Sequence, residues 1–221
     1  TASPAVLLMA GLGMETLMEF GRREAAWRVG RWLQQRQLPD GSLSESRAAE
    51  AVFHATAGAL RGWLAALPEL EQFARPAEKA CEFLRRWFGD EGRVMPPKSR
   101  SWNYEPDSVF TEPPDLSPLL AGGRRWPDTD WTTAALRGIE YWLRHGHRRF
   151  PAEQSAALVR RANLYLEWGR RAEALPLVEK LDKRQLPSGA VPEAEDSSLV
   201  LASTVAQAAL VWIRLFNRQR G

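Results

Sequence analysis

One eight-residue loop occurs twice in this chain. RQLPDGSL, residues 36–43, returns as RQLPSGAV, residues 184–191. When the two are aligned on Gly41 and Gly189, a threonine follows 15 residues after each glycine, in a long segment rich in small residues. Self-similarity of this kind is typical of supersecondary units that stack to bury a shared core. The loop therefore predicts a chain built as a series of similar units.

Each unit is predicted to be a helix, the loop and a second helix. The segment before the first loop, residues 23–36, is amphipathic, with apolar positions near one face: Ala25, Val29, Trp32 and Leu33. The segments after the loops are apolar on nearly every face, most clearly over residues 197–216. A helix of that kind must be surrounded by other helices. The pattern predicts outer helices before the loops and inner helices after them.

A third, degenerate copy lies between the two. TTAALRGIEYWL, residues 132–143, matches TAGALRGWLAAL, residues 56–67, and its loop is GDEGRVMPP around Gly92. The apolar N-terminal stretch, residues 4–20, is predicted to be a first inner helix. The chain is therefore expected to be all-α, with four inner helices and at least three outer helices.

The loop residues suit the end of one helix and the start of the next. Gly41 and Gly189 are expected to adopt a positive φ, which glycine adopts without steric cost. Side chains that accept hydrogen bonds precede the expected inner helices. The candidate N-caps are Ser44 or Ser46, Asp130, and Asp196 or Ser197.

These units resemble the helical hairpins of α/α toroids. An outer helix ending in Q-x-x-DG-S, a short crossing and an inner helix that begins near a threonine are similar to the repeats of terpenoid cyclases and prenyltransferase β-subunits. They are also similar to the repeats of toroidal polysaccharide lyases and glucuronyl epimerases. WLQQRQLPDGSL and KRQLPSGAVP carry the resemblance, which covers most of residues 22–217. It implies one domain over residues 1–221, an incomplete (α/α) toroid of about four helical hairpins.

One segment also fits a different repeat. Residues 162–181 place Ala162, Tyr165, Ala174 and Val178 where a tetratricopeptide unit has its packing positions. Stable arrays of that repeat need about three units. This alternative therefore depends on a single unit.

The middle unit carries an insertion. Gly92 and Thr132 are 40 residues apart, where the other two units have 15. The inserted segment contains seven prolines and is therefore predicted to form neither regular helix nor central strand. It also contains aromatic residues, which a disordered linker would lack: Trp102, Tyr104, Phe110 and Trp126. Residues 93–130 are expected to form an ordered lid.

Acidic residues gather where the expected inner helices begin. The topology places these helix N-termini around one mouth, with Asp40, Glu45, Asp128, Asp130, Glu193, Glu195 and Asp196. Clustered carboxylates raise one another's pKa, which suits general acid catalysis. Capping and the helix dipole favour acidic residues at the same positions, so a structural role stays open.

The main functional hypothesis is recognition or processing of a carbohydrate, an oligosaccharide or polysaccharide of a bacterial envelope. Flat aromatic rings suit the C–H faces of sugars, while carboxylates and arginines suit the hydroxyls. The candidate catalytic residues are Asp128, Asp130 and Glu193. The candidate ligand-binding residues are Trp102, Tyr104, Trp126, Trp131, Asp40, Glu45 and Glu195. The first alternative is a non-catalytic helical-repeat adaptor that binds a protein partner or a second copy.

The second alternative is an isoprenoid-acting toroid. DTDWT, residues 128–132, resembles the Asp-x-Asp-Asp-Thr motif of cationic terpenoid cyclases. In that family the middle aspartate protonates an alkene or epoxide, and the matching position here is Asp130. Trp131 stands where the family has a second adjacent aspartate. This hypothesis also requires a deep apolar cavity.

Several classes of function find no support. Net charge is +3, and acidic residues are interspersed with the arginines, so no nucleic-acid partner is expected. The apolar start is too short for a membrane span and lacks a basic lead-in, which makes a cytoplasmic location the default and leaves a periplasmic one open. Cys81, the single cysteine, can form no internal disulfide. His145 and His147 have too few partners for a zinc site, and neither cofactor nor metal is expected.

Overall fold

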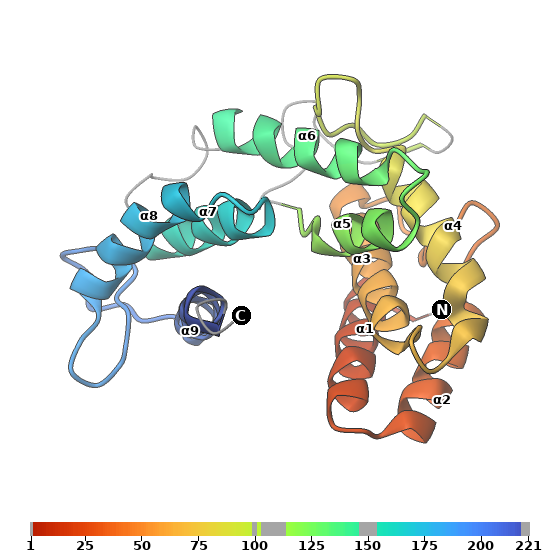
Figure 1. The fold of residues 1–221 in the computed structure, drawn as a ribbon, viewed down its shortest axis with the longest axis horizontal. Helices are drawn as coiled ribbons and strands as arrows, with labels where there is room; N and C mark the ends of the chain where they lie inside the picture. Colours follow the sequence, from red (N-terminus) through yellow and green to blue (C-terminus); the bar gives the residue numbers. More distant parts are fainter. Residues whose placement is uncertain (1, 99–100, 103–113, 146–153, 218–221) are drawn as a thin grey trace. The chain divides into compact units, whose positions relative to one another are not determined.

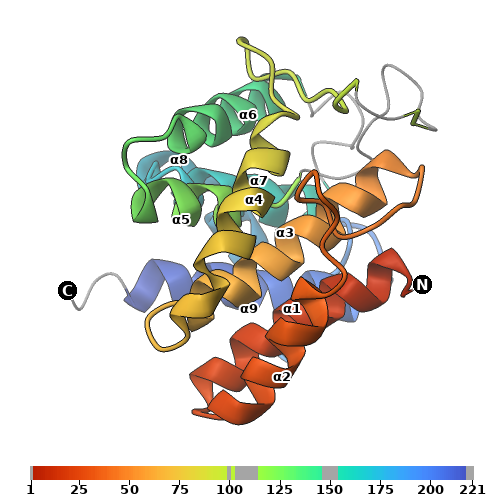
Figure 2. The same ribbon diagram turned by 90° about the vertical axis from the view of Figure 1, so that its right-hand side faces the viewer.

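The computed structural model describes residues 2–98, 101–102, 114–145 and 154–217. Those residues form nine α-helices, one short 3-10 helix and two isolated β-bridges, which confirms the all-α class (Figures 1 and 2). The chain divides into two compact units, Thr1–Glu140 and Tyr141–Gly221. The toroid arrangement and the single domain over residues 1–221 stay predictions.

Unit 1 is built around a central helix. Helix α3 (Ala49–Ala66) packs against both α1 (Pro4–Glu19) and α2 (Arg23–Gln34), as well as against the two helices that follow it. Helices α1 and α3 pack so closely that a β-carbon added to Gly11 would overlap with the carbonyl group of Gly58. The expected first inner helix is therefore confirmed as a helix, packed on the segment that was predicted to be the second one.

Helix α5 (Ser117–Arg125) lies inside the segment that was predicted to contain no regular helix. After the 3-10 helix η1 (Glu71–Phe73) and helix α4 (Ala74–Arg85), helix α5 packs against both α3 and α4. The prediction that residues 93–130 contain no regular helix is therefore wrong. Pro118 lies in the first turn of α5, where a helix needs no amide hydrogen, so that this proline starts a helix.

Helix α6 (Trp131–His145) is amphipathic, although its sequence resembles α3. Its buried side is formed by Trp131, Ala134, Ala135, Gly138 and Ile139, and the prediction of a helix apolar on every face is wrong for this copy. The face of α2 also differs slightly from the expectation. Its fully buried residues are Ala26, Gly30 and Leu33, while Ala25, Val29 and Trp32 are partly buried.

Unit 2 is a three-helix arrangement. Helix α7 (Ser155–Glu167) packs on both α8 (Arg171–Arg184) and α9 (Ala202–Asn217). The residues that suggested a tetratricopeptide unit, Ala162, Tyr165, Ala174 and Val178, all contribute to this core, as either repeat type would require. Unit 2 by itself does not enclose helix α9, because Leu210 is 53% exposed and Ile213 is 52% exposed.

The three loops share one backbone geometry, which confirms that the loop itself is repeated. In each copy the residue three positions before the glycine donates its amide to the carbonyl oxygen just after the glycine, at 2.8, 3.1 and 2.9 Å along the chain. The glycine amide donates back to the carbonyl of that first residue at 2.9, 2.9 and 2.8 Å. Gly41, Gly92 and Gly189 have φ angles of +92°, +77° and +85°. The expected positive φ holds for both predicted glycines and for the degenerate copy.

The predicted N-caps are mostly wrong. Helix α3 begins after Ala48, which offers no capping side chain. The Ser44 hydroxyl accepts from the Ser46 amide and the Ser46 hydroxyl accepts from the Ala48 amide, so both serines organise the turns before the helix. Helix α9 begins five residues after Ser197, whose hydroxyl accepts from the Leu199 amide. Asp130 does precede α6, and its backbone carbonyl accepts from the Ala134 amide.

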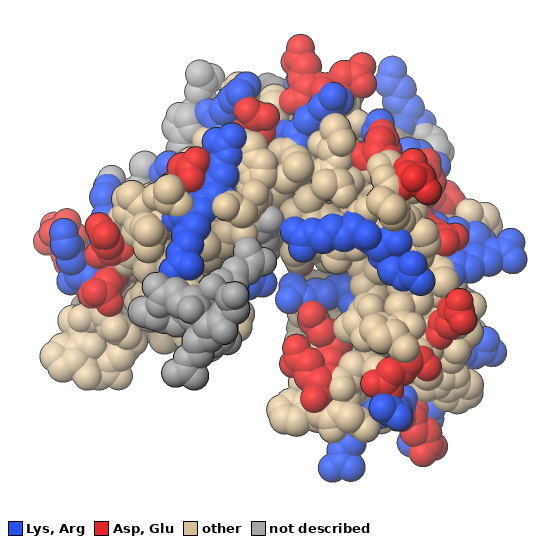
Figure 3. Space-filling view, in the orientation of Figure 1, with Lys and Arg blue, Asp and Glu red and all other residues tan. Residues whose placement is uncertain are grey.

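Acidic and basic side chains are interspersed on the face of unit 1 shown in Figure 3. Among the described helices, none is both long and apolar enough to span a lipid bilayer.

Candidate functional site: a tryptophan pocket beside helix α4

The turn between α5 and α6 is fixed by its own backbone. The Trp126 amide closes α5 by donating to the Gly122 carbonyl at 2.9 Å, and Pro127 prevents the helix from continuing. The Thr129 hydroxyl then donates to the Trp126 carbonyl at 2.8 Å. This hydrogen bond holds the chain in a tight turn, from which α6 starts at Trp131.

Two glycines in α5 bring this turn close to its neighbours. A β-carbon on Gly122 would overlap with the Cys81 sulfur on α4, and a β-carbon on Gly123 would overlap with Thr132 at the start of α6. Only glycine allows both contacts. The local sequence thereby sets the turn directly beside α4.

A pocket of about 390 Å³ lies where the turn meets α4. It is lined by Glu78, Lys79, Glu82, Trp126, Thr129 and Trp131. We call this site the tryptophan pocket. The two indole rings stand edge to face, with centroids 5.6 Å apart, and Trp131 is buried while Trp126 is partly exposed. The three charged residues come from one side of α4 and are exposed.

An ion pair fastens the same turn to the end of α4. The Asp130 carboxylate lies 2.6 Å from Nε of Arg85, and another nitrogen of that guanidinium donates to the Phe88 carbonyl at 3.1 Å. The Asp130 side chain is 58% exposed. Its contact gives this carboxylate a positioning role beside the pocket.

The thiol of Cys81 lies on α4 behind this pocket, fully buried. Burial raises the pKa of the Cys81 thiol far above its ordinary value, and the negative charges of Glu78 and Glu82 raise it further. A protonated, enclosed thiol is a poor nucleophile. Cys81 therefore belongs to the packing of α4 against α5.

The structure brings together only part of the predicted site. Trp126 and Trp131 line one pocket, and Asp128 lies exposed in the turn between them. Trp102 stands elsewhere, with its indole nitrogen donating to the Pro97 carbonyl at 2.7 Å and its ring 5.5 Å from that of Trp87. Tyr104 lies outside the described residues, so its predicted role stays a prediction.

The first-loop carboxylates have different surroundings. One oxygen of Asp40 accepts from both the amide and the hydroxyl of Ser42, at 3.1 and 2.8 Å, and the Asp40 backbone carbonyl accepts from Arg86. This aspartate therefore organises the turn. Glu45 is exposed, and it does not line the tryptophan pocket.

The remaining predicted carboxylates belong to unit 2. The Glu193 carboxylate accepts from the Thr204 hydroxyl at 3.2 Å, and the Glu193 backbone pairs with Leu199 and Ser155. Glu195 is exposed in the turn that follows. The proposed mouth that combines these residues with Asp128 and Asp130 stays a prediction.

The sequence analysis missed Glu78, Lys79 and Glu82. These residues lie in the segment AEKACEFLRR, which was taken only as an outer amphipathic helix. Glu78 and Glu82 are four positions apart, so they share one helix face. That spacing showed that they lie together, but it did not show that this face meets the tryptophans.

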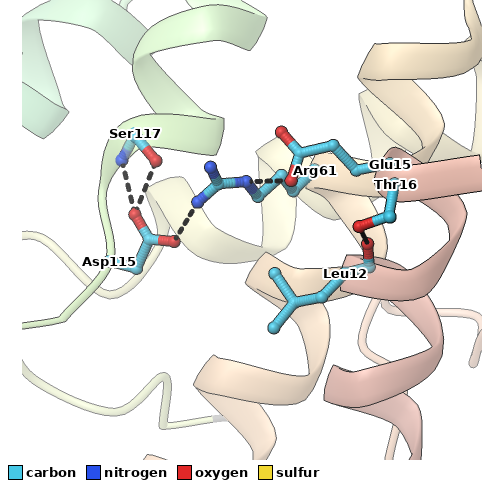
Figure 4. A network of polar contacts seen from close by, with 6 residues as sticks. All are labelled: Leu12, Glu15, Thr16, Arg61, Asp115 and Ser117. Atoms are coloured by element: carbon cyan, nitrogen blue, oxygen red, sulfur yellow. Dashed lines mark hydrogen bonds and ion pairs between the residues drawn. The ribbon is translucent and has the colours of Figure 1, made fainter. Parts of the chain in front are cut away.

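A second polar cluster in unit 1 is structural (Figure 4). Arg61 of α3 lies between two carboxylates, 2.5 Å from Glu15 of α1 and 3.4 Å from Asp115, just before α5. The other Asp115 oxygen accepts from the amide and the hydroxyl of Ser117. The cluster thereby ties the start of α5 to α1 and α3.

No three His, Cys, Asp or Glu residues within the described ranges are grouped to hold a metal ion. His145 is exposed, with its ring nitrogen 2.9 Å from the Tyr141 carbonyl. No protein-family model and no curated protein sequence matches this chain.

Proposed function

We propose that unit 1 binds a carbohydrate in the tryptophan pocket. The observation that carries the proposal is the meeting of two indole rings with two carboxylates, an ammonium group and a hydroxyl in one depression. Ligand sites typically combine an apolar wall with a few polar groups that fix orientation. Trp126 offers a partly exposed ring for the C–H face of a sugar. Glu78 and Glu82 offer acceptors for its hydroxyl groups.

The size of the pocket favours one sugar residue within a longer chain. About 390 Å³ is near the lower end of the usual range for small-molecule sites, roughly 300–1,000 Å³. The exposed positions of Glu78 and Glu82 leave room for neighbouring sugar residues to extend into solvent. A short oligosaccharide is therefore the expected ligand.

The charge of the lining narrows the sugar class. Two glutamates oppose one lysine in the pocket, and the carboxylate of neighbouring Asp130 is already paired with Arg85. The pocket thus carries a net negative charge, which disfavours the binding of uronic acids. Neutral sugars and amino sugars fit this balance better, because like charges in a shared site repel.

The same arrangement favours recognition over catalysis. Asp130, which the sequence analysis placed as an acid, is held in an ion pair. Cys81 is buried and protonated. The isoprenoid alternative gains no support, because it needs a deep apolar cavity at Asp130, whereas the adjoining pocket is lined by Glu78, Lys79 and Glu82.

A thermal-shift panel tests the proposal with four ligand classes: neutral and amino-sugar oligosaccharides, uronic-acid oligosaccharides, nucleotide sugars and prenyl diphosphates. A ligand at 100 times its dissociation constant stabilises the folded state by about 2.7 kcal/mol, which raises the melting temperature by about 2–4 °C. We expect this shift with the first class in wild type. Trp126→Ala and Glu78→Gln should lose it.

The matched control is Trp27→Ala, which removes an exposed tryptophan of α2 away from the pocket and should keep the shift. A shift with prenyl diphosphates alone would replace the carbohydrate by an isoprenoid. The absence of a shift with every class would overturn the proposal.

A further inference from the structure

The two carboxylates of the tryptophan pocket lie together on one helix. Glu78 and Glu82 are four positions apart on α4, so that their like charges share one helix face and repel each other. Both side chains are exposed, and within the described part of the chain neither carboxylate forms a hydrogen bond or an ion pair. The pocket therefore holds two negative charges that a ligand can neutralise.

The arginines nearest to Glu82 along the helix are engaged elsewhere. Arg85 and Arg86 follow Glu82 by three and four positions, the spacing at which helix side chains form ion pairs. The Arg85 guanidinium is instead held by the Asp130 carboxylate at 2.6 Å. That of Arg86 donates to the Asp40 backbone carbonyl at 2.5 Å and to the backbone carbonyl of Glu82 at 3.3 Å. The fold thus directs both cations away from the Glu82 carboxylate.

The Trp126 ring adds a second means of binding a cation. The face of an indole attracts a positive charge that lies within about 6 Å of the ring centre. The Arg125 guanidinium lies 5.7 Å from the centre of this ring, although Arg125 does not line the tryptophan pocket. The ring therefore borders one cation already, and it remains partly exposed where it lines the pocket.

The cation that fits these groups has an apolar body. A metal ion needs several ligands at once, and among the described residues no third carboxylate, histidine or cysteine joins Glu78 and Glu82 in a metal-binding group. An amino sugar matches both kinds of group in the pocket. Its C–H face can cover the Trp126 ring, while its ammonium group contacts the carboxylates.

The next step rests on the proposed carbohydrate function. We propose that the tryptophan pocket selects sugars that carry a free, protonated amino group, and that Glu78 and Glu82 determine this specificity. Their carboxylates accept charge-assisted hydrogen bonds from the ammonium group, which are stronger than those from a neutral hydroxyl. N-acetylation removes the positive charge of the sugar, so that an N-acetylated sugar should bind without this preference.

Lys79 allows a test that depends on the sign of a charge. Its ammonium group lines the same pocket, and like charges repel, so Lys79 opposes an amino sugar while the glutamates favour it. Glu82→Gln should lower the preference for an amino sugar, and Lys79→Gln should raise it. A variant that merely disturbs the fold would weaken the binding of every sugar. Opposite effects at two positions of the same helix therefore report charge recognition.

The experiment is isothermal titration calorimetry of the 221-residue chain with short oligomers of glucosamine, N-acetylglucosamine and glucose. Wild type should bind the glucosamine oligomer at least about tenfold more tightly than the other two. Exposed ion pairs contribute up to about fivefold each, and a cation on an exposed indole contributes about two- to fivefold. At about 1 M salt, where the Debye length is about 3 Å, this preference should shrink.

Three variants are compared with wild type. Glu82→Gln should lower the ratio of the glucosamine to the glucose affinity by about three- to fivefold, and Lys79→Gln should raise it by about two- to fivefold. The matched control is Glu24→Gln, which removes an exposed carboxylate that lies on α2, 3.5 Å from Arg28, and does not line the pocket. This control should keep the wild-type ratio.

The possible failures separate this inference from the carbohydrate proposal. A glucose oligomer that binds as tightly as the glucosamine oligomer would leave the carbohydrate proposal standing and overturn the preference for amino sugars. A lowered preference in both Lys79→Gln and Glu82→Gln would overturn the roles assigned to these charges. No binding of any oligomer would overturn both proposals. Equally tight binding of spermine, a polyamine, would also overturn both, because the pocket would then recognise positive charge without a sugar.

Discussion

The backbone carbonyl of Lys79 lies directly against the α-carbon of Gly41, so closely that a β-carbon would overlap with it. Gly189 has the same backbone conformation, with a φ of +85° against +92° at Gly41, but no described residue lies within 4 Å of a β-carbon placed on it. The pair separates two costs of replacing a turn glycine, namely the strain of a positive φ and the loss of helix packing.

Gly189→Ala is expected to lower the free energy of unfolding by about 1–2 kcal/mol, the cost of a left-handed conformation for a residue with a β-carbon. Gly41→Ala should lower it by about a further 1–3 kcal/mol, because α4 must move away from the loop. Urea denaturation of dilute samples measures both. Equal losses would show that the Gly41 contact contributes nothing to stability.

The two pocket tryptophans should differ in their effect on stability. Trp131 is buried at the start of α6, so Trp131→Ala is expected to lower the free energy of unfolding by about 3–5 kcal/mol. Trp126 is partly exposed, so Trp126→Ala should lower the free energy of unfolding by less. Chemical denaturation checks the order, and a larger loss at Trp126 would contradict it. Trp126 is therefore the better variant for binding experiments.

Asp130→Asn should have a small effect on stability that depends on salt. The ion pair with Arg85 is partly exposed, and such pairs contribute about 0.2–1 kcal/mol. At about 1 M salt the Debye length falls to about 3 Å, so wild type and variant should converge in stability. Denaturation at low and high sodium chloride measures this difference. A loss that persists at high salt would indicate that the aspartate stabilises the turn by other means.

Cys81 should make the protein less stable at high pH. The ordinary pKa of this thiol is 9.0, and burial, with Glu78 and Glu82, raises the pKa in the folded state far above that value. Above about pH 9 the unfolded chain therefore loses a proton that the folded chain keeps. The linkage slope is then negative, and stability falls by up to about 1.4 kcal/mol per pH unit.

The comparison with Cys81→Ala isolates this effect from the titration of other groups. The variant will be less stable at neutral pH because it leaves a small cavity, but its stability should fall less steeply above pH 9. Parallel pH profiles of the two proteins would contradict the assignment. Reaction of native Cys81 with a thiol reagent, which we expect to be slow, provides an independent check.

Local features were predictable because their causes lie within a few residues. The positive φ at Gly41 and Gly189 follows from hydrogen bonds that span three or four positions, so a repeated sequence gives a repeated turn. The helix at residues 4–20 follows from its composition in the same way. The helix α5 was missed because prolines were counted across the insertion, whereas Pro118 falls at the one part of a helix that tolerates it.

The candidate site was only half predictable. Trp126 and Trp131 are five positions apart, and one tight turn brings them together. Glu78, Lys79 and Glu82 reach them only because Gly122 and Gly123 let α5 pack closely on α4 and α6. No local pattern records which exposed helix face will border a turn some 50 residues away along the chain.

The sequence by itself determined the all-α class, the repeated loop and the conformation of its glycines, since hydrogen bonds between near neighbours specify them. The tertiary structure decided which faces are covered. It placed α4 against Gly41, whereas no described residue of unit 2 packs on Gly189 in this way, although the two loops are nearly identical in sequence. The difference arises because burial depends on contacts between residues that are distant along the chain, which the local loop sequence does not specify.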